Sequence, residues 1–123
     1  MEHRHRQIIQ HRGKTVIVQN YTGLAGQAYV DAVESNGKAG KTLDISEKRI
    51  LVDVTDSVVD KDVMKAFKSV SKTASSKISK TAVVGVSGIQ KILLRTVAAF
   101  AQLQINTFEN RDEALEWLAG DDT

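Results

Sequence analysis

The sequence contains no cysteine and no proline, and only 5% of its 123 residues are aromatic. Without cysteine, the chain can form neither a disulfide framework nor a thiolate metal site, and it lacks a cysteine nucleophile. We therefore expect a cytoplasmic protein. The absence of proline argues against a semi-rigid linker between domains. We expect residues 1–123 to form a single domain, which at this length buries about two thirds of the surface of its unfolded chain.

Long apolar runs are also missing from the sequence. The most apolar segment extends from Ile92 to Leu103, and polar residues such as Arg95 interrupt it. It is well short of the about 20 residues that a membrane-spanning helix needs. The basic N-terminus is followed by a strand-like run rather than by the apolar core of a secretory signal. We expect neither a transmembrane segment nor a secretory signal.

The net charge is small, but its distribution along the chain is uneven. The formal value is +2, composed of a balanced stretch in residues 1–60, a balance of +7 in residues 61–105 and a balance of −5 in residues 106–123. An electrostatic partner is therefore expected near the middle of the chain.

Hydrophobic periodicity predicts both strands and helices. Runs rich in Ile and Val predict strands over residues 6–10, 14–20, 49–55, 80–86 and 105–108. The first two flank Gly13, which supplies the positive φ of a tight hairpin turn. Helices are predicted over residues 26–39, 60–75 and 88–102. Gly37 and Gly40 weaken and then end the first of them.

A last helix is predicted to begin after Asn110, because Asn110 and Glu113 have the spacing of a capping box. The complete order is ββαβαβαβα. Strands that alternate with helices pair in parallel through right-handed crossovers, and the opening hairpin adds an antiparallel pair. The sequence therefore predicts an α/β fold with a mixed sheet of about five strands and about four helices.

Ser87 and Gly88 follow the predicted strand over residues 80–86 and allow several interpretations. A catalytic elbow G-x-S-x-G needs glycine where Ile89 stands, and the histidines all lie near the hairpin: His3, His5 and His11. The P-loop and dinucleotide patterns fail at required glycines. A helix cap, worth about 1 kcal/mol, and a generic anion site at a helix N-terminus remain open.

No metal site or cofactor is predicted. The imidazoles of His3 and His5 are too few for a closed zinc site, and flanking arginines repel a cation. Four aspartates follow or end the predicted third strand, at the edge where open α/β sheets place ligands: Asp53, Asp56, Asp60 and Asp62. They could serve acid–base chemistry, but capping of the next helix is the favoured interpretation.

A stripe of lysines follows one side of the predicted helix over residues 60–75. Its members recur at helical spacing, opposite the apolar stripe: Lys61, Lys65, Lys68 and Lys72. A solvated basic face is the simplest account, and contact with anionic lipid or an acidic protein is the alternative. Nucleic acid is not expected, because no arginine cluster or aromatic platform accompanies the lysines.

The predicted helix over residues 88–102 has an unusually wide apolar face. At helical spacing its apolar residues cover an arc of roughly 220°, more than a sheet alone would bury. Leu93, Val97 and Phe100 belong to this face. The excess surface is expected to contact neighbouring helices, a second copy of the chain or an apolar ligand.

Three segments carry a resemblance to a known family: residues 50–56 (ILVDVTD), residues 80–88 (KTAVVGVSG), and Phe108 with residues 113–118 (EALEWL). The chain resembles the STAS-like group of sporulation anti-sigma-factor antagonists and transporter C-terminal domains, and its bacterial branch grouped with CRAL-TRIO lipid-binding domains. The resemblance implies a small non-enzymatic regulatory domain that often self-associates.

Phospho-regulated members of this group carry a D-S-S-G or D-T-S-G turn after the third strand. Here residues 56–63 read DSVVDKDV, without a serine–glycine pair. Ser57 remains a candidate phosphate acceptor, although added charge beside Asp56 and Asp60 would be repulsive.

We therefore predict a non-enzymatic STAS-like domain that recognises a protein partner or a small apolar or anionic ligand, a lipid included. The candidate binding residues are Thr55, Ser57, Ser87, Gly88, Leu93, Val97 and Phe100. Two alternatives stay open. One is a serine hydrolase that uses Ser87, and the other is a self-associating module, such as a homodimer, joined through the helix over residues 88–102 or through an exposed sheet edge.

Overall fold

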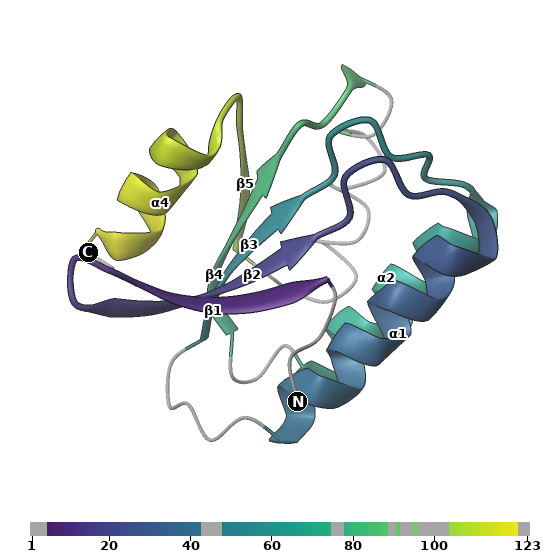
Figure 1. The fold of residues 1–123 in the computed structure, drawn as a ribbon, viewed down its shortest axis with the longest axis horizontal. Coiled ribbons are helices and arrows are strands. Elements are labelled where there is room, and N and C mark those ends of the chain that lie inside the picture. Colours follow the sequence, from purple (N-terminus) through teal and green to yellow (C-terminus); the bar gives the residue numbers. More distant parts are fainter. Residues whose placement is uncertain are drawn as a thin grey trace.

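The computed structural model describes residues 5–42, 48–74, 78–88, 91, 95 and 104–120. Its centre is a five-stranded sheet with the order β1-β2-β3-β4-β5 (Figure 1). The strands are β1 (Arg6–His11), β2 (Lys14–Asn20), β3 (Lys48–Asp53), β4 (Ile78–Val84) and β5 (Ile105–Phe108). β1 and β2 are antiparallel, and all other neighbours are parallel. The predicted mixed α/β sheet is confirmed.

A two-residue turn joins β1 to β2. Arg12 and Gly13 both have positive φ, 51° and 77°, which is the conformation of a type I′ hairpin turn. The twist of this turn matches the twist of the two strands, so the register continues without interruption from His11↔Lys14 to Arg6↔Gln19. The predicted hairpin therefore forms as expected.

Helices cover both faces of the sheet (Figure 1). α1 (Gly26–Thr42) and α2 (Lys61–Ala74) lie together on one face, and α4 (Arg111–Ala119) lies on the other. Gly88, Lys91 and Arg95 are helical, in agreement with the predicted helix over residues 88–102. Leu93, Val97 and Phe100, which we assigned to its apolar face, lie outside the described residues. None of the described helices is long and apolar enough to cross a membrane.

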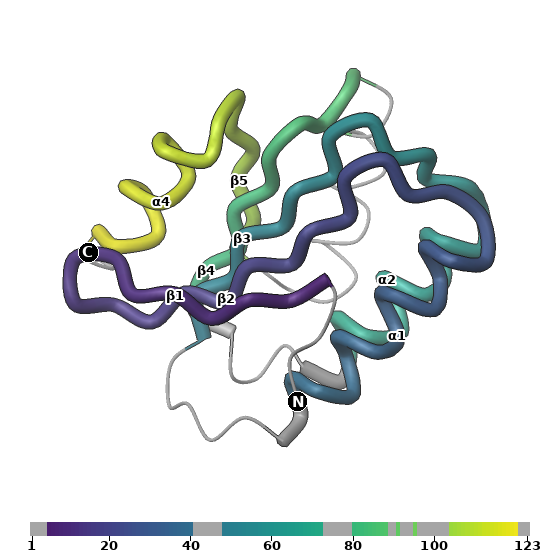
Figure 2. Tube along the Cα trace, viewed as in Figure 1, coloured from purple at the N-terminus to yellow at the C-terminus, as the bar shows by residue number. Residues whose placement is uncertain are grey.

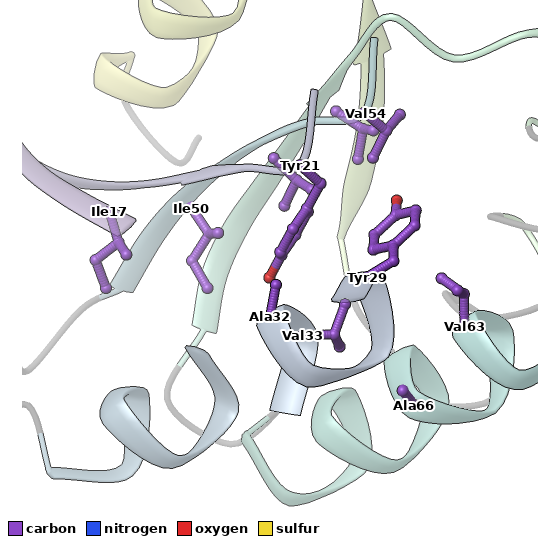
Figure 3. Close-up of a cluster of buried hydrophobic side chains, with 11 residues drawn as sticks. Ile17, Tyr21, Tyr29, Ala32, Val33, Ile50, Val54, Val63 and Ala66 are labelled. Carbon is purple, nitrogen blue, oxygen red and sulfur yellow. The ribbon is translucent and has the colours of Figure 1, made fainter. Parts of the chain in front are cut away.

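Two apolar cores result from this arrangement. The larger lies between the sheet and the helix pair and contains Tyr21, Tyr29 and Val63, which are 1%, 0% and 0% exposed (Figure 3). The rings of Tyr21, Tyr29 and Phe67 pack against one another with centroids 5.4 to 5.8 Å apart. The second core lies under α4 and contains Val16, Leu51 and Leu118. Strand residues thus alternate between the two cores.

The first helix is longer than the sequence predicts. α1 passes through Gly37 and Gly40 and ends at Thr42, so the expectation that Gly40 ends it is wrong. A Cβ at Gly37 would lie 2.7 Å from a side-chain methyl of Val70. Gly37 therefore allows α1 and α2 to approach closely, and its role is in packing rather than in helix termination.

Buried basic side chains cap the end of α4. Arg49 Nε donates to the carbonyl of Leu118 at 2.9 Å, and Lys80 Nζ donates to the carbonyls of Trp117 and Gly120 at 3.0 and 3.2 Å. Positive charge is favourable at a helix C-terminus, where carbonyls lack partners within the helix. At the other end the side chain of Asn110 accepts a hydrogen bond from Glu113 N at 2.9 Å, which confirms the predicted N-cap.

Candidate functional site

The loops that follow the parallel strands meet at one edge of the sheet. Backbone hydrogen bonds join them: Gly23 N donates to Thr55 O, and Val54 N donates to Val84 O, both at 2.9 Å. Ligands in open α/β folds usually bind at this carboxyl edge of the strands. We call the described residues 21–25, 54–60 and 85–88 the carboxyl edge.

Asp53 holds the carboxyl edge together. Its Oδ1 accepts hydrogen bonds from Thr55 N at 3.0 Å and Thr55 Oγ1 at 2.6 Å, and its Oδ2 accepts from Arg111 Nε at 2.9 Å. The Asp53 side chain is only 10% exposed, whereas that of Arg111 is 42% exposed. This carboxylate therefore joins the end of β3 to the first turn of α4.

The surroundings of Asp53 also determine its ionisation. Burial alone raises the pKa of this carboxyl, but the hydrogen bonds from the hydroxyl and the amide of Thr55, together with Arg111, outweigh burial and lower the pKa below 3.8. A carboxyl whose pKa is lower in the folded chain stabilises the fold above its unfolded pKa, and that contribution is lost as the pH falls through the folded pKa.

We expect acidification to destabilise the wild type more than Asp53→Asn. The variant keeps an acceptor for Thr55 but has no charge to lose, so its unfolding midpoint temperature should fall less between pH 7 and pH 3. Thermal unfolding followed by circular dichroism measures this difference. Arg111→Gln should also reduce the fall in the unfolding midpoint temperature, because it removes the cation that favours the ionised form of Asp53. Equal losses in wild type and Asp53→Asn would contradict this role.

Gly85 brings two predicted binding segments into contact. Its φ is +83°, and a Cβ built on it would lie 2.2 Å from Thr55 Oγ1 and 2.7 Å from Thr55 Cα. The turn after β4 therefore lies directly against the turn after β3. The structure places Thr55 and the segment of Ser87 and Gly88 at the same edge of the sheet, as the parallel pairing predicts.

Ser57 lies beneath the loop surface rather than on it. Ser57 is 8% exposed, and its hydroxyl forms a 3.1 Å hydrogen bond with the hydroxyl of Tyr29. Burial raises the pKa of Tyr29 to about 12, so this phenol is neutral at pH 7. The predicted site residue Ser57 thus anchors the loop after β3 to α1.

Val58 is a feature of the carboxyl edge that the sequence analysis missed. It is 58% exposed, although it follows buried Ser57. Its backbone N–H donates to Leu24 O at 2.9 Å, and Asp56, two positions earlier, has a φ of +57°. The adjacent valines at positions 58 and 59 in an otherwise polar loop were the signal that could have revealed an exposed apolar group.

Ser87 occupies the position of a helix cap. Its carbonyl accepts a hydrogen bond from Lys91 N at 2.9 Å, and the residue is exposed. The described histidines lie elsewhere. His5 borders β1, three strands from β4 and so about 14 Å away at the usual strand spacing. His11 lies at the hairpin turn and contacts Glu116 at 2.8 Å. No described imidazole is therefore placed to activate Ser87.

The remaining charged candidates have clear positions. Asp60 Oδ1 accepts from Val63 N at 2.8 Å and caps α2, which confirms the capping interpretation for this residue. Lys61, Lys65 and Lys72 are exposed and Lys68 is half-buried, while Val63 and Ala66 of the same helix are in the core. Within the part of the chain that the structure describes, no group of three His, Cys, Asp or Glu residues could hold a metal ion.

Comparisons with known proteins agree with this architecture. An uncharacterized protein of the DUF3478 family with a SpoIIAA-like fold, from Shewanella loihica PV-4, superimposes with a TM-score of 0.69 at 16% identity, over 93% of this chain and 92% of that one. An anti-sigma-factor antagonist (STAS) domain protein from Planctomyces limnophilus gives 0.65 at 13% identity, over 94% and 98%. No curated protein matches. A family model described as SpoIIAA-like matches residues 21–119, and the chain therefore belongs to the SpoIIAA-like family.

Proposed function

We propose that this domain is a regulatory module without catalytic activity, which binds a protein partner through its carboxyl edge with Val58 as the central apolar contact. The observation that carries the proposal is the exposure of Val58. Among the residues whose side-chain burial the structure describes, Ile8 and Val58 are the large hydrophobics with exposed side chains, at 44% and 58%. This apolar side chain lies at the edge of the sheet where open α/β folds place their ligands, and its exposure leaves it available to a partner.

The loop that carries Val58 is held in place before any partner binds. Hydrogen bonds fix it at three points: Val58 N to Leu24 O, Ser57 N to Val54 O, and the Ser57 hydroxyl to Tyr29. Binding to a loop that is already fixed costs less conformational entropy than binding to a loop that becomes ordered only in the complex. The fixed loop is therefore better suited to bind a partner than a flexible loop of the same composition would be.

The charge next to Val58 suggests the chemistry of the partner. α2 begins three residues later, and its exposed lysines, which include Lys61 and Lys65, continue the surface away from the loop. Exposed Asp56 and Asp60 lie closer to Val58 in the loop than these lysines do, so a partner with an apolar socket and side chains of both charges would complement this surface. The similar protein from Planctomyces limnophilus is described as an anti-sigma-factor antagonist, so an anti-sigma factor is the partner class to test first.

Val58→Asp should weaken binding to a cognate anti-sigma factor, encoded in the same genome, by at least about tenfold, because it puts a charge into an apolar contact. Isothermal titration calorimetry with purified proteins measures the change. Ser35→Asp is the matched control, since it introduces the same charge at an exposed position on α1, outside the carboxyl edge. Unchanged affinity in Val58→Asp, or no binding to any anti-sigma factor of that genome, would refute the proposal.

A further inference from the structure

The outer edge of β1 has backbone groups that none of the described strands uses. β1 is the first strand in the sheet order and pairs with β2 on one side only. Asn20 N donates to His5 O at 2.9 Å, and the same register runs through the whole hairpin. In an antiparallel pair, alternate residues direct their N–H and C=O groups at the partner. The backbone N–H and C=O groups that point toward β2 are therefore those of His5, Gln7, Ile9 and His11.

The residues between them face outward. Arg6, Ile8 and Gln10 direct their N–H and C=O groups away from β2, at the open edge of the sheet. In the part of the chain that the structure describes, no element is paired with this edge. The exposed side chain of Ile8, at 44%, lies in the middle of the strand.

β1 lacks two of the usual protections of an edge strand, although it carries one charged residue, Arg6, near its start. Its register has no bulge, and the chain contains no proline. Natural sheets often block their edges with these devices, or with very short strands. The opposite edge, β5, is such a short strand of four residues, whereas β1 has six. The β1 edge is therefore the one suited to pair with another strand.

We propose that two copies of this chain associate through antiparallel pairing of their β1 strands, centred on Ile8, to form one continuous ten-stranded sheet. In this two-fold register Ile8 faces Ile8 of the second copy. Arg6 faces Gln10, and Gln7 faces Ile9. Each facing pair of outward residues exchanges both hydrogen bonds. The two Ile8 side chains become buried against each other.

Self-pairing is favoured over another partner because β1 is complementary to itself. With Ile8 at the two-fold axis, the cation of Arg6 lies opposite a neutral amide, so no like charges face each other between residues 6 and 10. The apolar contact is symmetrical, as an isologous interface requires. The proposed interface is centred on Ile8, which pairs with Ile17 of β2, and it includes no residue of the carboxyl edge.

The absence of cysteine allows a register-specific test on the full chain. Ile8→Cys introduces the only thiol. In the proposed dimer two facing Cα atoms are about 5.5 Å apart, within the range that a disulfide spans. Gln10→Cys is the matched control, because in this register its two copies lie about 13 Å apart along the strands. Mild oxidation should convert Ile8→Cys, and not Gln10→Cys, into a covalent dimer on a non-reducing gel.

A second measurement compares the oligomeric state of the wild type with that of two variants. Ile8→Pro removes the outward N–H and the Ile8 side chain but no hydrogen bond to β2, so it should leave the β1–β2 hairpin intact and abolish the dimer. Sedimentation velocity from micromolar to millimolar concentration should show a monomer–dimer equilibrium in wild type and in Val58→Asp, but a monomer in Ile8→Pro. A wild type that stays monomeric throughout, a dimer unaffected by Ile8→Pro, or equal cross-linking at positions 8 and 10 overturns the proposal.

Discussion

Gly85→Ala is expected to destabilise the fold by about 3 kcal/mol or more. A non-glycine residue in the left-handed region costs about 1–2 kcal/mol, and Gly85 has a φ of +83°. The added Cβ would also meet Thr55 Oγ1 at 2.2 Å and the Thr55 backbone at 2.7 Å. Relief requires a backbone shift, which adds about 1–3 kcal/mol. Urea unfolding at pH 7 measures the change in unfolding free energy.

Gly88→Ala is the control for this substitution. A Cβ at Gly88 meets nothing within 4 Å, and its φ is not in the left-handed region. Because alanine favours a helix more than glycine does, the variant should be neutral or more stable by up to about 1 kcal/mol. The same small effect at both glycines would show that the contact between Gly85 and Thr55 does not constrain the carboxyl edge.

Tyr29→Ala should cost about 4 kcal/mol of unfolding free energy. Tyr29 is 0% exposed, and its ring packs against Tyr21 and Phe67 with centroids 5.4 and 5.8 Å away. Truncation of a large buried aromatic leaves a cavity and typically costs about 3–5 kcal/mol. Small domains are stable by only about 5–15 kcal/mol, so a large share of the folded stability would be lost.

Tyr29→Phe separates the ring from the hydroxyl. It keeps the packing and removes only the hydrogen bond to Ser57, so a loss of about 1 kcal/mol is expected. This variant remains folded and measurable by urea unfolding even if Tyr29→Ala does not fold. A loss in Tyr29→Phe as large as that in Tyr29→Ala would mean that the hydroxyl, and not the ring, stabilises this core.

The order of elements could be predicted from the sequence because it depends on local patterns. The Ile and Val runs of β1 and β2, the Gly13 turn and the Asn110 cap each act over a few residues, and each is found as predicted. The glycines were harder to interpret. Gly37 carries no local sign that its missing side chain accommodates Val70 of another helix. Its effect comes from tertiary packing, which periodicity does not reveal.

The positions of Thr55 and of the turn at Ser87 could be predicted from the sequence, but the orientation of the loop side chains could not. Parallel pairing alone places Thr55 and the Ser87 turn at one edge. Whether a loop side chain points inward or outward depends on contacts between distant segments. Ser57 points at Tyr29, 28 positions earlier, and Asp53 meets Arg111, 58 positions later. Such contacts explain why Ser57 is buried and the neighbouring Val58 is exposed.

The position of α4 has a consequence for synthesis on the ribosome. The hairpin turn passes close to this helix, since His11 and Arg12 both contact Glu116 (Figure 2). Val16 and Val18 emerge about a hundred residues before Ala114 and Leu118, the helical residues that cover them. Translation of the intervening chain takes roughly 5 to 20 seconds, and during this time the apolar side chains of Val16 and Val18 lack their helical cover and can be bound by chaperones.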